Sequence, residues 1–533
     1  MRTIVLEDRV TACAWLLEVR GRQATLIHGA DVELVGEGWF EGCWAGEFAA
    51  GGFDRARHVF GSGGKRTDHG WLIVTPSHLV EAVYIVKRGQ RCLVSNSLAF
   101  VTRWAGVEIP FDPGLAGRIL STRRGIDAYE RDLAHGAGWS LHRAAFDNLL
   151  IVEGEPRWIP KPTAPPRPLD FTSYRSFVST VLAELTANAN VPGRVKRYQL
   201  GATCSSGYDS TACAVLAAEL GAHRGFSIAA ARGGGADSGG ALLEQLGMTA
   251  IEAPRPTPRE ISDCAEAEFI ATGMGGDEYP FLAFAPHLPG TLLLTGFNGG
   301  DMWGVEGAVS RTAVTLEEPA GASLAEFRLR TGFVHVPVGW IGFEWQPELR
   351  SLCLSPAMAP WHLGTDYERP IARRIIEERG IPRGSFGTVK RATSMTFYFS
   401  SHWWSRAALA ELAACERHEL PRLTERLAYR LRSLWRTAIL TSYFGIKRLL
   451  KTVGWGKRLD KLRDRFVADF WGYAYRHPRY VGMAFVWAQR RIRLRYPTAG
   501  DPALTEGTPP VSARPAQPEQ GRRTMASSGS GRG

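Results

Sequence analysis

Residues 198–221, with the sequence YQLGATCSSGYDSTACAVLAAELG, decide the fold of the chain. Tyr198–Thr203 is a short candidate for a buried strand, and Thr211–Leu220 is rich in Ala and Leu, which favour a helix. The polar segment Ser205–Ser210 joins the two runs. Gly221 follows the second run, where a residue that accepts a positive φ commonly ends a helix. The stretch therefore predicts a strand, a tight loop and a helix.

A loop of this kind points backbone N–H groups and a helix N-terminus at one place, and that arrangement attracts phosphate. Asp209 would repel phosphate unless a divalent cation lay between the two groups. The loop therefore favours a site for a nucleotide with magnesium. Its candidate ligands are Ser205, Ser206, Gly207, Asp209 and Ser210. The alternative is an ordinary strand–turn–helix in which Asp209 or Ser210 caps the helix.

The length of 533 residues suggests about two to four domains, and 44% hydrophobic residues suffice for globular cores. Eight scattered cysteines without a C-x-x-C pair indicate free thiols in a reducing compartment and argue against a zinc site. The N-terminus lacks the apolar core of a signal peptide, and no apolar run approaches the roughly 20 residues of a spanning helix. We therefore expect a soluble cytoplasmic protein.

The net charge of +11 comes from one region of the chain. Residues 421–497 contain 19 Lys or Arg and 4 Asp or Glu, a net charge of +15, so the rest of the chain is about −4. This region reads as helical, with an apolar face marked by Leu423, Leu427, Leu431 and Leu434. Such a surface suits nucleic acid, an anionic membrane or an acidic peptide. The alternative is an arginine-rich helical cap on the preceding domain.

Residues 1–155 read as mostly β, because short runs of branched and aromatic residues alternate with turn residues. The clearest strand predictions are Trp71–Thr75, Ala82–Val86 and Gln90–Ser95. Residues 156–170 contain six prolines, which predicts a stiff, extended connection and a domain boundary.

Beyond that boundary, strand and helix signals alternate. Phe171–Ala189 and Ala241–Gly247 are predicted helices, and Gly225–Ala230 and Leu292–Leu294 are predicted strands. Alternation of this kind indicates an α/β domain with a doubly wound parallel sheet, in which ligands bind beyond the carboxyl ends of the strands. The end of the second strand, at Ile228, should then lie beside the polar loop and offer a place for adenine.

The segment Thr291–Gly304, TLLLTGFNGGDMWG, contains the predicted strand Leu292–Leu294 followed by a glycine-rich loop. Thr295 and Gly296, at the end of this strand, are candidate nucleotide contacts, and Asp301 stands at the start of the next helix. Because this loop should open at the same sheet edge, we expect Asp301 to lie opposite Asp209 across one cation.

A competing segment is Thr272–Glu278, TGMGGDE. It follows the helix-like stretch Cys264–Ile270 and not a strand, so we expect it not to open at the ligand edge of the sheet. We therefore prefer Asp301 as the second metal ligand. Asp277 and Glu278 remain candidates for lining a substrate pocket, or they form a solvated helix end.

Two segments carry a resemblance to a known family. The loop sequence SSGYDS resembles the S-G-G-x-D-S pyrophosphate loop (PP-loop) of ATP pyrophosphatases, with Ser206 in place of a glycine. Thr291–Gly304 resembles the G-x-G-x-D-E block of asparagine synthetases, with one extra residue and with Met302 in place of the glutamate. The chain therefore looks like an asparagine synthetase-like protein, in which the metal role of Asp301 carries over and the role of the glutamate does not.

This resemblance implies ATP and Mg²⁺ as cofactors and Asp209 and Asp301 as magnesium ligands. It also implies that ATP activates a small-molecule or peptide carboxylate as an acyl-adenylate, which ammonia or an amine converts to an amide. Within Tyr367–Thr393, Lys390 best matches the family's lysine that stabilises this adenylate. A lysine there would act as a mobile charge on departing pyrophosphate; the alternative is a surface lysine in a basic loop.

Residues 1–155 faintly resemble the glutaminase domain of asparagine synthetases, an Ntn-hydrolase fold, in a G-x-F-A…D…G pattern. That family uses a cysteine at position 2 as the nucleophile, whereas Arg2 occupies this position and Cys13 falls within a strand-like run. The resemblance therefore implies a degenerate glutaminase domain that does not hydrolyse glutamine.

The predicted organisation is thus a β-rich domain at 1–155, a linker at 156–170, and an ATP pyrophosphatase domain at 171–405. A basic helical extension follows at 406–497 and a disordered tail at 498–533. Two other functions stay open. The substitutions at Ser206 and Met302 favour a degenerate nucleotide-binding or partner-binding module, and the basic region would suit a PP-loop enzyme acting on tRNA.

Overall fold

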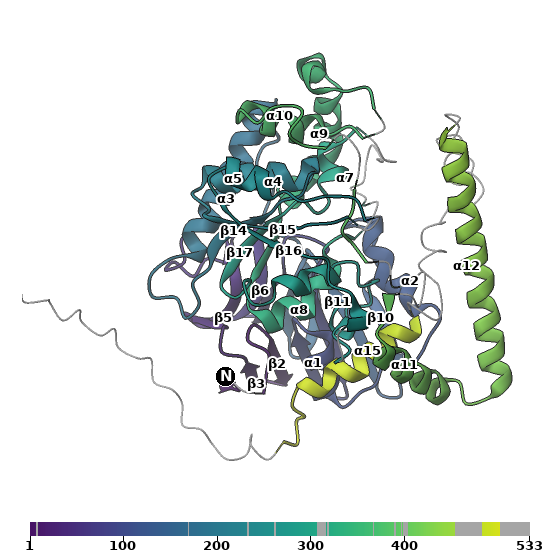
Figure 1. Ribbon diagram of the computed structural model, residues 1–533. Coiled ribbons are helices and arrows are strands. Elements are labelled where there is room, and N and C mark those ends of the chain that lie inside the picture. Colours follow the sequence, from purple (N-terminus) through teal and green to yellow (C-terminus); the bar gives the residue numbers. More distant parts are fainter. Residues whose placement is uncertain are drawn as a thin grey trace, which may run out of the picture.

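The computed structural model describes most of the chain and contains three sheets (Figure 1). The residues it does not describe are 7–8, 169, 232–233, 261–262, 306–315, 317–318, 366, 388–390, 396, 398–402, 453–481 and 502–533, together with the side chains of 260, 440, 451 and 452. The tail predicted at 498–533 thus lies almost wholly outside the described residues.

The N-terminal region is built from two sheets that pack face to face. The first has the order β1 (Arg2–Val5), β3 (Gln23–His28), β2 (Trp15–Arg20), β9 (Arg91–Ser95), β8 (Val83–Arg88), β11 (Trp139–Ala144) and β10 (Asp132–Gly136). The second has the order β13 (Glu155–Ile159), β12 (Asn148–Val152), β7 (Gly70–Val74), β6 (Val59–Thr67), β5 (Gly38–Trp44) and β4 (Glu33–Val35). All neighbours are antiparallel except β1 and β3.

Alternate residues of these strands point into one shared core, as the period of two along a strand requires. Trp15 and Leu17 of the first sheet meet Trp39 and Ile73 of the second, and the rings of Trp15 and Trp39 are 5.5 Å apart between centroids. The prediction of a β-rich N-terminal region is confirmed. Cys13, however, lies in the turn before β2 and not within a strand.

The proline-rich stretch begins inside this sandwich. Residues 156–159 form most of β13, an edge strand in which Pro156 is paired with Ile151. A proline is tolerated there because an edge strand leaves one side without ladder partners. Lys161 then donates to the Thr75 carbonyl, and Arg57 donates to the Pro162 carbonyl at 2.8 Å, so the start of the connection is fixed to the sandwich.

The third sheet is wholly parallel, with the order β16 (Thr249–Ala253), β15 (Arg224–Ile228), β14 (Gln199–Thr203), β17 (Thr291–Thr295) and β18 (Val334–Pro337). This confirms the predicted α/β class and parallel sheet. From β14 the chain proceeds to β15 and β16 on one side and later to β17 and β18 on the other. The strand order therefore reverses between β14 and β17, which in such sheets is where a ligand crevice opens.

Helices cover both faces of the parallel sheet, which explains why all five residues of β17, TLLLT, are buried and why its three central residues are leucines. Leu292 and Leu294 face a core shared with α3 (Phe171–Ala189), α4 (Tyr208–Glu219) and α10 (Pro370–Glu378). Leu293 faces the opposite core, shared with α6 (Glu266–Ile270) and α8 (Ala325–Thr331). The remaining helices near the sheet are α5 (Gly240–Gln245), α7 (Gly299–Trp303) and α9 (Gln346–Cys353).

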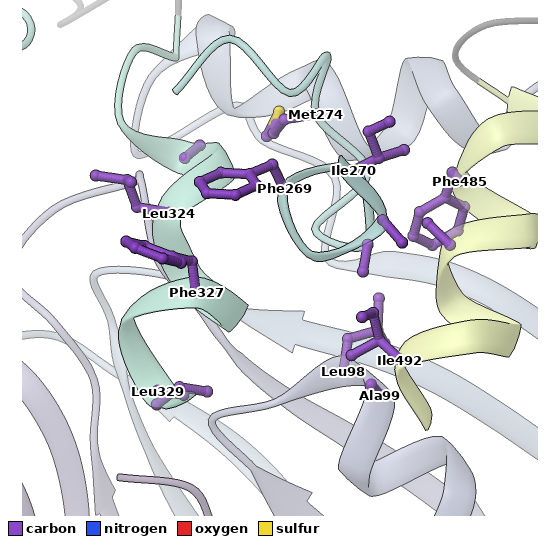
Figure 2. Packing of buried hydrophobic residues seen from close by; sticks show 14 of the residues in the cluster. Leu98, Ala99, Phe269, Ile270, Met274, Leu324, Phe327, Leu329, Phe485 and Ile492 are labelled. Atoms are coloured by element: carbon purple, nitrogen blue, oxygen red, sulfur yellow. The ribbon is translucent and has the colours of Figure 1, made fainter. Parts of the chain in front are cut away.

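The core that Leu293 faces also includes buried side chains from the N-terminal region and from the C-terminal helices. Figure 2 shows this core: Leu98 of α1 (Leu98–Ala105) lies beside Ile492 of α15 (Ala484–Ile492), and Phe269 of α6 lies beside Phe327 of α8.

Helix α11 (Arg406–Glu419) enters the same core through Ala408 and Leu412. Glu411 of α11 accepts a hydrogen bond from Arg491 of α15 at 2.6 Å. Two helices of the predicted basic extension are therefore part of the folded body, in agreement with the alternative of an arginine-rich helical cap. The long helix α12 (Leu423–Thr452) stands at the edge of the molecule (Figure 1).

Candidate functional site

A pocket of about 300 Å³ opens at the carboxyl ends of β14, β15 and β17, where the strand order reverses. Eight residues expected from the sequence line it: Ser205, Gly207, Asp209, Ser210, Ile228, Thr295, Gly296 and Asp301. These residues are up to 96 positions apart in the sequence, from Ser205 to Asp301, and the parallel sheet brings them together because its strand ends share one edge.

Helix α4 points its N-terminus into this pocket. It begins at Tyr208, three residues before the predicted start, so Asp209 and Ser210 lie in its first turn and Gly207 is the N-cap. The alternative in which Asp209 or Ser210 caps the helix is therefore wrong. Gly207 supplies no side-chain cap, and a Cβ there would still stand 3.4 Å from Ser205 Oγ and 3.5 Å from Tyr367 Oη. The helix end is thus open to an anionic ligand.

Two serines fix the shape of the loop before α4. The Ser205 amide donates to Ser210 Oγ at 3.1 Å, and the two hydroxyl oxygens are 2.8 Å apart. The Gly207 amide donates to Ser205 Oγ at 3.1 Å. These bonds close the loop onto the first helical turn.

Ser206 does not line the pocket, unlike the other predicted loop residues. Its hydroxyl donates to Asp237 Oδ1 at 2.6 Å, and its amide donates to the Asp237 carbonyl at 3.2 Å. Burial raises the pKa of Asp237, while the bond from Ser206 and the charge of Arg391 oppose this shift. A serine is accommodated at this position because its side chain is turned toward Asp237.

The loop after β17 lies directly against Asp209. A Cβ at Gly296 would come within 2.5 Å of the Asp209 backbone, and one at Gly299 within 2.9 Å of the Asp209 side chain. Both positions therefore require glycine. Asn298, in the left-handed region at φ 60°, donates from Nδ2 to Asp301 Oδ2 at 3.3 Å. The close approach explains how Asp209 and Asp301 come to line the same pocket.

Arg369 is a pocket residue that the sequence analysis missed. Its guanidinium is buried, lies over the Tyr367 ring at 5.1 Å and places Nε 3.9 Å from Asp209 Oδ1. A Cβ at Gly300 or Gly304 would come within 2.8 Å of this guanidinium, so two further glycines make room for it. Arg369 directly precedes Pro370 at the start of α10, and no local sequence pattern indicates that its side chain faces the loop.

The predicted catalytic Lys390 lies outside the described residues. The next four residues, 391–394, line the pocket, and Arg391 donates to the Ala236 carbonyl. The basic segment therefore reaches the site at Arg391, on the side of Asp237.

The segment 272–278 also reaches the pocket, through Met274, Gly275, Asp277 and Glu278. The expectation that it would not open at the ligand edge is wrong, because the chain after α6 folds back across the strand ends. Glu278 is buried and accepts bonds from the amides of Gly321 at 2.7 Å and Ser323 at 3.1 Å, and burial raises its pKa. Glu278 thus anchors a neighbouring loop, while Asp277 is a further carboxylate on the pocket wall, besides those of Asp209, Asp237 and Asp301.

One wall of the pocket is apolar. It is formed by Phe226, Phe281, Phe284, Phe297, Met274 and Leu120. Leu120 belongs to α2 (Leu115–Leu120) of the N-terminal region, so both halves of the chain contribute to the cavity. Such a wall favours a flat or apolar ligand group beside the polar loop.

A buried polar cluster connects the pocket with the N-terminal sandwich. Thr295 Oγ1 is 2.8 Å from His335 Nε2, and His335 Nδ1 is 3.9 Å from Glu81. Arg328 of α8 binds Glu81 at 2.8 Å and binds Glu41 of β5 through two nitrogens at 2.8 and 3.0 Å. The ionic core of this cluster thus joins α8 to the second sheet of the sandwich.

Among the described residues, no group of three or more His, Cys, Asp or Glu side chains is placed to hold a metal ion. Within the same part of the chain, no helix has the length and apolar character needed to cross a membrane. No family model matches the sequence, and no curated protein matches it significantly. The function is therefore argued from the site itself.

Cys13 is not placed for nucleophilic catalysis. The side chain is fully buried, burial raises the pKa of its thiol, and its amide donates to the Leu329 carbonyl at 3.0 Å. We expect the purified protein to release no glutamate from glutamine, since only an accessible thiolate attacks an amide. Glutamate release that disappears in the Cys13→Ala variant would contradict this expectation.

Because His58 is buried, we expect the protein to lose stability in acid. Burial, reinforced by Arg57 and Lys161, lowers its pKa from 6.5 to about 3, so the folded protein keeps it neutral while the unfolded chain takes up a proton below pH 6.5. The contribution of His58 to the free energy of unfolding is fully present above pH 6.5, and at pH 5 it is about 2 kcal/mol smaller. Urea unfolding at pH 8 and pH 5 should show a smaller pH effect for His58→Gln than for the parent. The exposed His69, changed to Gln, should leave that effect unaltered.

Proposed function

We propose that the chain binds ATP with magnesium and forms an amide bond by way of an acyl-adenylate. The observation that carries this proposal is the packing of the glycine-dependent loop after β17 against Asp209, at the reversal point of a parallel sheet, in front of an open helix N-terminus. That combination favours a polyphosphate held near carboxylates.

The first turn of α4 would hold the phosphates through its backbone amides, together with the hydroxyls of Ser205 and Ser210. Mg²⁺ is commonly bound by one or two carboxylates together with substrate phosphate oxygens. Asp209 and Asp301, which both line the pocket, fit that donor set. The ion would neutralise charge on the phosphates. Ile228, Thr295 and Gly296 would border the nucleoside.

In the proposed reaction, a carboxylate oxygen of the substrate attacks the α-phosphorus of ATP, and the bond to pyrophosphate breaks. Ammonia or an amine then attacks the acyl carbon and displaces AMP, losing one proton. Arg369 and Arg391 lie on the pocket wall, where fixed guanidinium groups would stabilise negative charge on the departing pyrophosphate. Lys390 is proposed for the same task from its position in the sequence.

A second candidate is a module that binds the nucleotide without turning it over. Met302 favours it, because this side chain is buried in the core of the parallel sheet where the resembled family has a glutamate. The pocket then lacks that glutamate, although Asp277 supplies another carboxylate.

The decisive experiment measures ATP binding by calorimetry with and without Mg²⁺, followed by carboxylate-dependent exchange of labelled pyrophosphate into ATP. Binding with exchange supports the ligase, and binding without exchange against a broad set of acids supports the module. Absence of magnesium-dependent ATP binding would overturn both.

A further inference from the structure

Helix α12 carries an exposed apolar stripe. Its members are Leu423, Leu427, Leu431, Leu434 and Trp435, of which Leu427 is 50% exposed and Trp435 68% exposed. They recur at spacings of three and four residues, so they lie along one side of the helix. Burying such side chains is favourable by about 1.5–3 kcal/mol each, which makes a stripe of five a binding surface.

The body of the protein contacts the opposite side of α12. Tyr429 and Ser433 are buried, and the Tyr429 ring meets Phe111 edge-on with 5.4 Å between centroids. Residues two positions apart point about 200° away from each other on a helix. Leu427 and Leu431, on either side of Tyr429 in sequence, therefore face away from the body.

The helix is also strongly basic. Leu423–Thr452 contains seven Lys or Arg and a single acidic residue, Glu425. Arg430 and Arg432 flank Leu431 in sequence, which places them on the two borders of the apolar stripe. Arg430 donates to Glu416 of α11 at 2.7 Å and so ties the helix to the body, whereas Arg432, on the other border, is exposed. Long arginine side chains at such borders can extend to charged groups while the leucines enter an apolar phase.

We propose that α12 lies in the surface of an anionic lipid bilayer, with its leucine and tryptophan stripe among the acyl chains and its arginines at the headgroups. A second copy of the helix would bring two strongly positive surfaces together. Nucleic acid would engage the arginines and leave the leucines in water. An anionic bilayer is the partner that satisfies both faces, and amphipathic helices rich in basic residues bind there.

The test is flotation of the full chain with vesicles of phosphatidylcholine alone or with 30% phosphatidylserine. We expect binding only to the anionic vesicles, weakened by salt and at least tenfold weaker in the Leu431→Glu/Leu434→Glu variant. The matched control is Leu34→Glu/Leu354→Glu, which adds the same charges at two exposed leucines elsewhere and should bind like the parent. Thermal melting confirms that each variant is folded.

Three outcomes would overturn the proposal. The parent could fail to float with anionic vesicles at low salt, or the Leu431→Glu/Leu434→Glu variant could float as well as the parent. The protein could also bind a fluorescent oligoribonucleotide more tightly than vesicles and equally well in both variants, which would identify a nucleic-acid surface.

Discussion

Asp209→Asn is expected to lower magnesium-dependent ATP binding, or turnover where it is measurable, by at least a hundredfold. The carboxylate lies in the first turn of α4, against Gly299 and beside Asp301, so it is one of two groups that would hold the ion opposite the phosphates. A hundredfold loss corresponds to about 2.7 kcal/mol. Unfolding free energy should change by no more than about 1 kcal/mol, because the asparagine keeps the shape and Arg369 keeps its bond to the Glu368 carbonyl.

Two further variants separate the metal role from a general effect of charge. Asp301→Asn should behave like Asp209→Asn, whereas Glu348→Gln, in the first turn of α9 and outside the pocket, should leave binding unchanged. Asp277→Asn tests which glycine-rich segment carries the second ligand. If Asp277→Asn abolishes magnesium-dependent binding and Asp301→Asn does not, segment 272–278 supplies the ligand.

The sequence predicted the parallel sheet and most of the pocket because these depend on local signals. The strand at Gln199–Thr203, the polar loop Ser205–Ser210 and the glycine loop after Thr295 are each contained in a short segment, although the helix after the polar loop starts three residues earlier than predicted. Parallel pairing then fixes which loop ends meet. Phe171–Ala189 was predicted with its observed bounds, since its apolar spacing is continuous.

What the sequence did not predict depends on contacts between distant segments. Arg369 faces Asp209 only because Gly300 and Gly304 leave room for its guanidinium. The segment 272–278 reaches the pocket although it follows the helix α6 and not a strand of the parallel sheet. Helix α15 fills a core shared by α1, α6 and α8, so its apolar residues could not be assigned to that core from their own neighbourhood (Figure 2).

Arg328→Met is expected to lower the free energy of unfolding by about 3–5 kcal/mol. Arg328 is almost fully buried between Glu41 and Glu81, which hold its pKa well above the ordinary value although burial alone would lower it. Methionine keeps much of the side-chain volume but leaves two buried carboxylates without a cation. Urea unfolding followed by tryptophan fluorescence measures the loss.

The matched control is Arg131→Met, which removes an arginine from the exposed pair with Asp147 and should cost less than about 1 kcal/mol. Adding Glu41→Gln and Glu81→Gln to Arg328→Met removes the uncompensated charges, so the triple variant should recover much of the lost stability. A parent-like unfolding curve for Arg328→Met would mean that the cluster is hydrated or already neutral.

The same variants also test whether the cluster matters to the pocket. Arg328 is tied through Glu81 and His335 to Thr295 at the end of β17, so the triple variant keeps the fold while changing the surroundings of one pocket residue. If the proposed site depends on this support, ATP binding in the triple variant should weaken severalfold at temperatures where the protein is fully folded. If ATP binding by the folded triple variant is unchanged, the role of the cluster is only to join the sandwich to α8.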